Sequence, residues 1–375
     1  MSRQFDTKTT EGATRGPEPM TERIAIAGAG MAGAYLYRLL RNRGVEVEIF
    51  DRMLSTGCGV KPCAWGTSRD FATLVIAAGL DAERYALRRL PYIFMDEFRV
   101  PADLATVDKP RLLKDLLGDA RVRCDELSVA EYDRVIDATG TARAFLPPID
   151  GDRLIRCVQR RVHTAKGQEG RIRAGGVGYA WCFPLHEGAY HLGCGTILAE
   201  PQERLDELGW VREAGGEVVC GCTSAIRLTG AHGAQPFVTR IGPTQIWGVG
   251  EAIGCVAPLA GDGIVPGMRS VALLLDHWDD PAGYTKDILR EFRWMRGESR
   301  VLDKLLTGRR LSPSDALVLR RNARRMGMEV GIRQAVRLME RIRSGSPASK
   351  EPPGPRESAG TAAAEQGSRP ESRVS

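Results

Sequence analysis

The chain has 375 residues, of which 43% are hydrophobic, and a formal net charge of +6. This is enough for two modest domains, or for one domain with a large insertion, around a buried core. No apolar run approaches the ~20 residues that span a bilayer, and residues 1–20 lack the apolar segment of a signal peptide, so we expect a cytoplasmic globular protein. The nine cysteines are an odd number without paired CxxC spacing, which predicts neither a disulfide framework nor a metal site.

The first structured stretch has the pattern of a dinucleotide cradle. An apolar strand over 24–27 leads into Gly28, Gly30 and Gly33, and the helix that follows precedes a second strand ending at Asp51, 23 positions after Gly28. Gly28 permits a tight turn, Gly30 lets the backbone approach a pyrophosphate, and Gly33 lets the helix pack closely on the strand. The alternative is a glycine-rich turn in an ordinary βαβ unit. The complete order of strand, turn, helix, strand and acid favours the cradle.

The start of that first helix is expected to bind an anion. Its free backbone N–H groups, which include those of Met31 and Ala32, lie at the positive end of the helix dipole. Asp51 is placed to accept hydrogen bonds from ribose hydroxyls, and Arg52 follows it directly. We therefore assign these four residues to the cofactor.

The middle of the chain predicts an insertion that ends when the chain returns to the first sheet. Small residues over 53–66 predict a loop, residues 67–90 have helical spacing, and Pro91 begins an expected inserted sheet. A short helix precedes residues 133–140, where a strand ends in the small-residue turn DATG. We therefore expect residues 21–52, 133–144 and 241–280 to form one nucleotide-binding domain, with residues 53–132 inserted in it.

The second half of the chain predicts an antiparallel sheet followed by basic helices. Four strand patterns fall within 145–240, and helical patterns follow within 281–343. From Lys286 to Arg343 there are 16 Lys and Arg against 7 Asp and Glu. Such helices either meet an anionic partner or present an ordinary solvated face. Residues 1–20 and 344–375 have little to bury and are expected to be disordered.

Three separated motifs together resemble the FAD-binding segments of the flavoprotein group that includes aromatic-ring hydroxylases and geranylgeranyl reductases. They are the glycine fingerprint, the DATG turn and a late segment that begins at Gly250-Glu251, where the group has Gly-Asp. The resemblance implies an α/β fold: a Rossmann-like FAD-binding domain, an inserted antiparallel-sheet substrate domain and a C-terminal helical region. The further residues that it implies at the cofactor are Ala138, Gly140, Gly250, Glu251, Pro258, Gly261, Gly263 and Ile264.

Two more segments resemble the geranylgeranyl reductases in particular. KPCAWG, at 61–66, is similar to their KPCG segment, with Ala64 in place of the glycine, and GYAWCFP, from Gly178, is similar to their YxWxFP signature. The resemblance places Cys63 and Ala64 beside the flavin. It implies Cys63 and Tyr179 as catalytic candidates, and as substrate-binding residues Trp181, Phe183 and Pro184.

The aromatic residues of GYAWCFP also favour an apolar substrate on physical grounds. Tyr179, Trp181 and Phe183 alternate, so they project from one face of a strand and can line an apolar tunnel. The alternative is that they fill an interface between the sheet and the nucleotide-binding domain. His186 and His191 flank an expected hairpin turn and are predicted to be surface residues.

The leading hypothesis is an FAD-dependent reductase of geranylgeranyl or polyprenyl double bonds, with NADPH, NADH or another donor as reductant. Its expected partners are an apolar small molecule and an anionic membrane surface, with no nucleic acid. One alternative is a monooxygenase of an aromatic or polyketide-like substrate, because the same motifs serve both chemistries. Another is a flavin-dependent isoprenoid cyclase or binding protein without net redox turnover.

Overall fold

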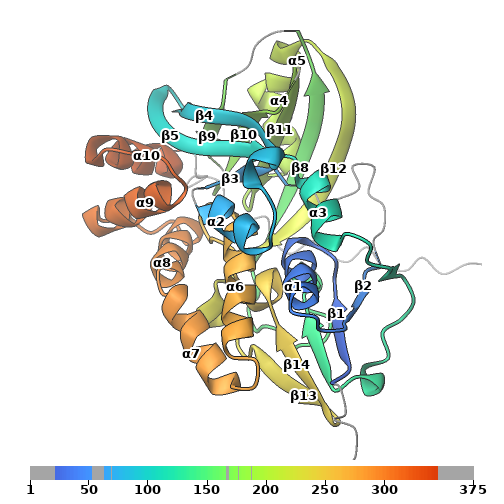
Figure 1. The fold of residues 1–375 in the computed structure, drawn as a ribbon. Coiled ribbons are helices and arrows are strands. Elements are labelled where there is room, and N and C mark those ends of the chain that lie inside the picture. The colour runs from blue at the N-terminus through green and yellow to red at the C-terminus, as the bar shows by residue number, and fades with distance from the viewer. Residues whose placement is uncertain are drawn as a thin grey trace, which may run out of the picture.

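A computed structural model describes residues 22–52, 63–68, 70–165, 169–175, 177–186 and 188–344. The predicted disorder of residues 1–20 and 345–375 therefore lies outside the described residues. Figure 1 shows two parts, with the first strands and α1 in the lower part and a large sheet in the upper part. This arrangement confirms the predicted α/β class.

The lower part is built on a six-stranded sheet in the order β13-β14-β7-β1-β2-β6. The strands from β14 to β6 are parallel, and β13 is an antiparallel edge strand. The strands are β1 (Ile24–Ala27), β2 (Glu48–Phe50), β6 (Val122–Arg123), β7 (Arg134–Asp137), β13 (Val238–Ile241) and β14 (Thr244–Gly248). Three separated stretches of chain thus meet in one sheet, as predicted, and the carboxyl ends of β1, β7 and β14 lie side by side. In open parallel sheets this edge is where ligands bind.

Helices cover this sheet, and α1 is central among them. α1 (Met31–Asn42) packs against α3 (Lys109–Leu117) and α6 (Ile264–Asp276). The start of α6 lies close to the start of α1, because Gly250 and Gly267 both approach Ala32. Two helix N-termini are therefore brought toward the same edge of the sheet.

The upper part is a single eight-stranded sheet in the order β12-β8-β11-β10-β9-β4-β5-β3. Its strands are β3 (Gly66–Thr67), β4 (Ala86–Met95), β5 (Phe98–Val107), β8 (Leu154–His163), β9 (Arg171–Ala174), β10 (Gly178–Pro184), β11 (Ala189–Thr196) and β12 (Glu217–Arg227). The predicted insertions 53–132 and 145–240 are thus two halves of one sheet, joined where β4 pairs in parallel with β9. The boundaries of these two insertions also differ from the predicted ones, because β6 and β13 belong to the lower sheet.

The predicted helix over 67–90 is shorter than its pattern. α2 spans Asp70–Ala77, and Gly79 follows in the left-handed region with a φ of +75°. A short helical turn over Ala82–Tyr85 leads into β4, which pairs with β5 over most of its length. The hairpin therefore overrides the helical spacing of residues 86–90.

The C-terminal helices cover the junction of the two parts. They are α7 (Pro281–Glu291), α8 (Met295–Leu306), α9 (Pro313–Arg325) and α10 (Ile332–Ser344). The helical patterns predicted within 281–343 form these four helices, and Figure 1 shows the orange and red helices rising from the lower part to the large sheet. Buried side chains of α9 and α10, such as Ala323 and Ala335, form one apolar cluster with β4 and β5. α9 and α10 therefore pack as part of the upper, large-sheet half of the molecule. Within the described residues, no helix is both long enough and apolar enough to span a bilayer.

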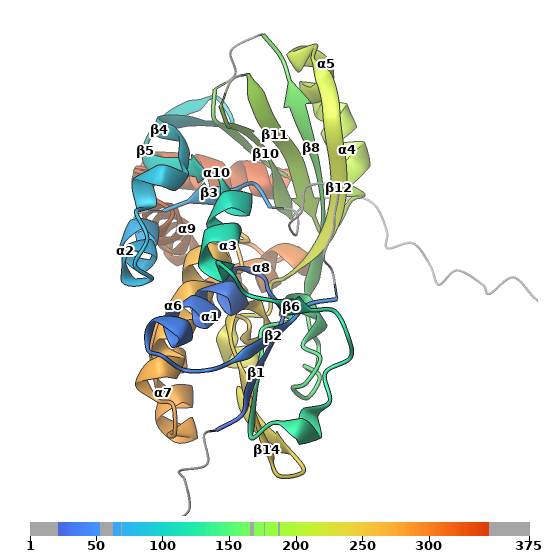
Figure 2. The same ribbon diagram turned by 45° about the vertical axis from the view of Figure 1, so that its right-hand side comes forward.

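The opposite face of the large sheet is covered separately. α4 (Pro201–Leu208) and α5 (Trp210–Ala214) contribute Leu205 and Trp210 to an apolar cluster with Ala180, Cys182 and other strand residues. Figure 2 shows α4 and α5 beside β8 and β11, on the side away from α9 and α10. The sheet thus has apolar layers on both faces.

Two buried arginines bind backbone carbonyl groups near the junction, and one of them, Arg227, joins the upper part to the lower part. Arg227, at the end of β12, donates to the carbonyl oxygens of Gly140, Thr141 and Glu251 at 2.8–3.0 Å and pairs with Asp152 at 2.9 Å. Arg143 donates to the carbonyl oxygens of Pro147, Pro236 and Ala252. Both guanidinium groups satisfy carbonyl groups at the ends of β7 and β14 that would otherwise be buried without donors.

We expect Arg227→Met to destabilise the protein by roughly 3–5 kcal/mol, because it leaves the Asp152 carboxylate and three carbonyl groups without their donor. The measurement is the free energy of unfolding from denaturant titration. Arg240→Met, at an exposed arginine on β13, is the control and should change it by no more than ~0.5 kcal/mol. Equal effects of the two changes would contradict the role given to Arg227.

Candidate functional site

The glycine turn after β1 has the close approaches that the fingerprint predicts. A Cβ on Gly28, whose φ is +106°, would lie 2.4 Å from the Ala138 carbonyl oxygen, and a Cβ on Gly33 would lie 1.8 Å from the Gly28 carbonyl oxygen. A Cβ on Gly30 would meet nothing within 4 Å. Gly28 and Gly33 are thus required by the fold itself, whereas Gly30 faces open space at the start of α1. This is the space that a pyrophosphate group needs.

The predicted acid lies beside the cradle and helps to hold it. Asp51 follows β2, and its Oδ2 accepts a hydrogen bond of 2.7 Å from the Ala29 N–H. Arg52 is exposed and lies 4.0 Å from Glu126 in a surface ion pair. Asp51 therefore helps to hold the glycine turn, whereas Arg52 lies on the exposed surface beside it.

The two later cofactor segments meet the cradle as predicted. Gly250 has a φ of +64°, and a Cβ there would lie 2.8 Å from the Ala32 Cβ. One carboxylate oxygen of Glu251 accepts a hydrogen bond from the Arg227 N–H at 2.8 Å. Glu251, which stands where the related motif has Asp, thus uses this oxygen to contact the end of β12. Its predicted contact with a cofactor stays a prediction.

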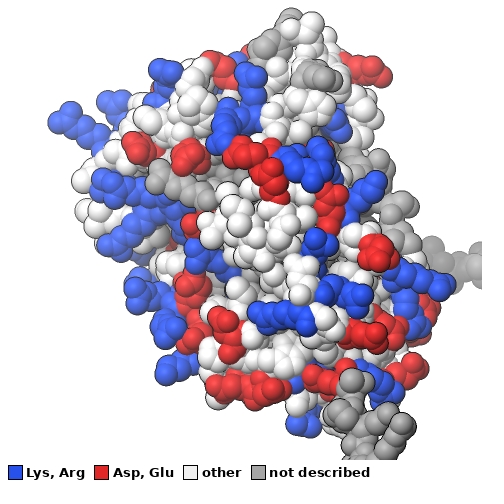
Figure 3. Space-filling view, in the orientation of Figure 1, with Lys and Arg blue, Asp and Glu red and all other residues white. Residues whose placement is uncertain are grey.

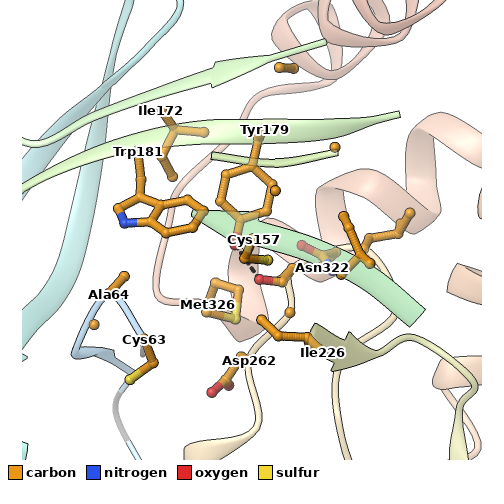
Figure 4. A pocket seen from close by; sticks show the side chains of 18 of the residues that line it. Cys63, Ala64, Cys157, Ile172, Tyr179, Trp181, Ile226, Asp262, Asn322 and Met326 are labelled. Atoms are coloured by element: carbon orange, nitrogen blue, oxygen red, sulfur yellow. Dashed lines mark hydrogen bonds between the residues drawn. The ribbon is translucent and has the colours of Figure 1, made fainter. Parts of the chain in front are cut away.

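A cavity of about 260 Å³ lies between the large sheet, the loop before β3, the loop before α6 and the C-terminal helices. It brings together nine of the predicted residues, which come from three distant stretches of the chain. They are Cys63, Ala64, Tyr179, Trp181, Phe183, Pro258, Gly261, Gly263 and Ile264. Figure 4 shows Tyr179 and Trp181 on the sheet side of this cavity, with Cys63, Ala64 and Asp262 on the other side.

The three aromatic residues of the predicted wall face one cavity. Tyr179, Trp181 and Phe183 all line the cavity from β10, and the Trp181 indole N–H donates to Gln159 Oε1 at 3.2 Å. Pro184 does not line the cavity, because the alternation of β10 turns it to the other face. Its predicted contact with substrate is therefore not supported by the geometry.

Tyr179 is held as a structural anchor of the cofactor loop. Its hydroxyl donates to the Ala260 carbonyl oxygen, and burial raises the pKa of Tyr179 well above its ordinary value. A proton that is both engaged and hard to remove is poorly suited to transfer. The geometry therefore favours a positioning role for Tyr179 over its predicted catalytic role.

Cys63 lies at the cavity wall next to a cation. The Lys109 ammonium group, at the start of α3, donates to Cys63 Sγ at 3.4 Å, and Lys109 itself is buried. Sequence patterns did not predict Lys109 at the site, because it is distant in sequence and lies in an ordinary amphipathic helix. The contact gives the Cys63 thiol a polar neighbour within the wall of an otherwise apolar cavity.

Asp262 is a further acidic group of the cavity that the sequence motifs did not reveal. It lies between Gly261 and Gly263, and its Oδ1 accepts the Ile264 N–H at 3.2 Å at the start of α6. Burial raises the pKa of Asp262 to about 6, although hydrogen bonds from the Ile264 and Val265 N–H groups and the charge of Arg325 lower it. A carboxyl group with such a pKa can hold or release a proton near neutral pH.

The prediction that His191 is a surface residue is wrong. His191 lies within β11, is 1% exposed and stacks edge to face on Trp65 with ring centroids 4.5 Å apart. Burial lowers the pKa of His191 to about 4, so the ring is neutral near pH 7. The hairpin turn lies closer to His186, which is exposed. The turn lies where it was expected, between Pro184 and Ala189, but β11 begins directly after it and places His191 inside the sheet.

The C-terminal helices close the cavity, which sequence analysis did not predict. Their contributions are Leu302, Leu305, Leu319, Asn322, Ala323, Met326 and Leu338. The excess of Lys and Arg in this region predicts a charged outer face. The inner faces of these helices are apolar, and they line the cavity. No group of three His, Cys, Asp or Glu side chains suited to a metal ion occurs within the described residues.

Comparison with known proteins supports the fold. No protein-family model matches the chain. An uncharacterized protein of Methanocaldococcus jannaschii is 24% identical over 292 residues, which cover 63% of this chain and 78% of that protein. A geranylgeranyl bacteriochlorophyll reductase-like protein from Thermoplasma acidophilum has a TM-score of 0.63 at 17% identity, covering 87% of this chain and 97% of that chain. This chain shares the fold of the Thermoplasma acidophilum protein.

Two further solved structures share this fold with different chemistries. A tryptophan 6-halogenase from Streptomyces toxytricini has a TM-score of 0.58 at 15% identity, covering 89% of this chain and 92% of that chain. A flavoprotein/dehydrogenase from Cytophaga hutchinsonii has a TM-score of 0.54 at 13% identity, covering 82% and 92%. The resemblance to the group of geranylgeranyl reductases and related flavoproteins is thus confirmed in the fold, and the reaction must be argued from the site.

The buried Asp262 predicts a pH-dependent effect on stability. Its folded pKa of about 6 lies above the ordinary 3.8. The folded protein therefore retains a proton that the unfolded chain has lost between these values, and the contribution of this group to stability falls as pH rises through that window. Asp262→Asn should stabilise the flavin-free protein by up to ~3 kcal/mol at pH 7, with the gain disappearing toward pH 4.

The measurement is the difference in unfolding free energy between the two proteins across pH 4.5–7.5. Asp276→Asn removes an exposed carboxylate at the other end of α6 and is the matched control. A difference between Asp262→Asn and wild type that stays constant over this range would show that Asp262 is not the group responsible.

Proposed function

We propose that this protein is an FAD-dependent oxidoreductase that reduces carbon–carbon double bonds of a polyprenyl compound of the geranylgeranyl type. One observation carries the proposal. A single apolar cavity is lined both by the predicted cofactor segments, residues 63–66 and 258–264, and by the aromatic wall of β10. An apolar substrate in this cavity would therefore lie next to the segments expected to hold the flavin.

The residues present fit FAD. The open space at Gly30 and the N-terminus of α1 suit a pyrophosphate, and Asp51 lies at the end of the neighbouring strand. The N-terminus of α6, whose first residue Ile264 lines the cavity, suits a group that gains negative charge on reduction. The N-termini of α1 and α6 thus offer two separate contact points, and a long dinucleotide such as FAD requires two.

FAD, when bound and reduced, supplies the hydride for such a reaction. The side chains of the protein position the substrate, exclude water from it and supply a proton. Trp181, fixed by Gln159, presents an apolar face to the substrate, and Tyr179 holds the loop before α6 through Ala260. The second carbon of the double bond needs a proton, for which the Cys63 thiol and the Asp262 carboxyl group are the acids that line the cavity. NADPH, NADH or another donor restores the reduced cofactor.

The volume of the cavity limits what it holds at one time. About 260 Å³ is slightly below the ~300–1,000 Å³ of typical ligand sites. The cavity therefore suits one reactive segment of a polyprenyl chain, with the remainder extending outward. This limit favours stepwise reduction of individual double bonds.

The proposal is tested with purified protein, dithionite and a panel of geranylgeranyl compounds under anaerobic conditions. We expect reoxidation of the flavin and a gain of two hydrogen atoms for each double bond reduced, measured by mass spectrometry. Cys63→Ser should slow single-turnover reduction by ~10²–10⁴-fold if Cys63 supplies the proton. Incorporation of oxygen in air with NADPH, but no saturation, would favour a monooxygenase. Reduced flavin that no polyprenyl compound reoxidises would favour a non-redox role.

The cofactor prediction is tested at Gly30. Gly30→Val should leave the unfolding free energy within ~0.5 kcal/mol of wild type, because its side chain enters open space, but should abolish FAD binding. Binding is measured by flavin fluorescence quenching in apoprotein titrations. Gly44→Val is the comparison outside the cradle, where a Cβ also meets no atom within 4 Å but a φ of +75° adds strain. Unchanged FAD affinity in Gly30→Val would contradict the cradle assignment.

The outer face of α9 and α10 supports peripheral contact with an anionic membrane, which we also propose. Leu317 and Ile332 are 44% and 56% exposed, and Arg321 and Arg333 are exposed near them in sequence. Figure 3 shows Lys and Arg gathered at the left edge of the molecule, where Figure 1 has α9 and α10. Exposed apolar side chains among basic ones suit the interface of an anionic bilayer.

We expect flotation with anionic vesicles at low ionic strength and its loss at high salt. Leu317→Ser combined with Ile332→Ser should weaken flotation without changing FAD binding. Ile241→Ser, at an exposed apolar residue on β13, is the matched control. Equal recovery with neutral and anionic vesicles would contradict the proposal.

A further inference from the structure

Two polar side chains in the cavity wall have buried atoms without hydrogen-bond partners. They are Ser224 on β12 and Asn322 on α9, and the unpartnered atoms are Ser224 Oγ and Asn322 Nδ2. Both residues line the cavity, one from the sheet and one from the helix layer. A buried polar atom without a partner destabilises a protein, so native structures rarely retain one without a reason.

The positions of the two residues relate them to one end of the cavity. Ser224 pairs with Cys157 across β12 and β8, and Figure 4 shows Cys157 and Asn322 both directed into the cavity near Tyr179. The other polar groups there are already engaged, since Tyr179 donates to Ala260 and Gln159 accepts from Trp181. Ser224 and Asn322 are therefore the groups left to meet a ligand.

The charges around the cavity restrict that ligand. Its described lining contains Asp262 but no Lys, Arg or His. A phosphate or carboxylate group brought inside would lose its hydration and meet no cation among the lining residues, because the Lys109 ammonium group contacts Cys63 but does not itself line the cavity. This loss of hydration is costly. A hydroxyl, ether or carbonyl oxygen loses less and can pair with an amide and a hydroxyl group.

We propose that Asn322 and Ser224 form a polar subsite that binds an uncharged oxygen group of the substrate. The inference rests on the proposed class of substrate, a polyprenyl compound, and adds that the segment within the cavity carries a hydroxyl, ether or carbonyl oxygen. The Asn322 amide donates to that oxygen, and the Ser224 hydroxyl donates to it or accepts from it. Any anionic head group then lies outside the cavity.

The experiment measures the dissociation constants of farnesol, β-farnesene and farnesyl diphosphate for the oxidised FAD-loaded protein by calorimetry. These share one carbon skeleton and carry an alcohol, no oxygen and an anionic diphosphate group. We expect farnesol to bind about 5- to 100-fold more tightly than β-farnesene. Asn322→Leu and Ser224→Ala should each reduce this preference while leaving the affinity for β-farnesene equal or higher.

The control is Thr223→Ala, one residue away on β12 and exposed to solvent, which should leave the preference unchanged. Asn322→Asp keeps the shape of the side chain but adds a charge and removes the donor, so it should also weaken farnesol binding. Equal binding of farnesol and β-farnesene, tighter binding of the diphosphate, a preference that survives Asn322→Leu, or no binding of any of the three would overturn the inference.

The outcome is separable from that of the proposed function because it requires no turnover. A preference for farnesol that depends on Asn322, without reoxidation of reduced flavin by any polyprenyl compound, would refute the reductase and leave the subsite in place. Reduction of polyprenyl double bonds without such a preference would do the reverse.

Discussion

The structure depends on how buried backbone carbonyl groups are satisfied where the two sheets meet. The loops after β7 and β14 leave their sheet at this junction, where no further strand can pair with them. Arg227 and Arg143 supply the missing donors, and each guanidinium group reaches three carbonyl oxygens. A planar group with five N–H donors suits this task in a way that a lysine does not. The loops that carry the predicted cofactor segments are therefore tied to the large sheet through β12.

Local stereochemistry explains which parts of the fold could be predicted from the sequence. The cradle requires glycine at Gly28 and Gly33 because backbone atoms lie where a Cβ would be, so the spacing of these residues carries the structure with it. Alternation in β10 likewise fixes the direction of its aromatic side chains. The pairing of β4 with β9 depends on contacts between distant segments that no local pattern records. The union of two insertions in one sheet was therefore not predicted.

The residues of the candidate site likewise fall into those that local sequence patterns predict and those that they do not. The residues of its predicted cofactor side fall within short sequence motifs, so they could be recognised from the sequence. Asp262, Lys109 and Asn322 were missed because their significance arises only from burial and from neighbours supplied by other elements. His191 shows the same limit, since its burial follows from the pairing of β11 with β8 and β10, which the position of the turn alone does not reveal.

The closure of the cavity by α8, α9 and α10 affects the order in which the site is completed during synthesis. Every strand of both sheets, the glycine turn and α6 precede these helices in the chain. A nascent chain that has emerged as far as α6 holds all the predicted cofactor segments, while the cavity still lacks the wall that contains Asn322 and Met326. The order of the chain thus allows cofactor loading before the apolar chamber is sealed. The helices α8, α9 and α10, which follow α6 in the chain, would then close the cavity after the cofactor segments have assembled.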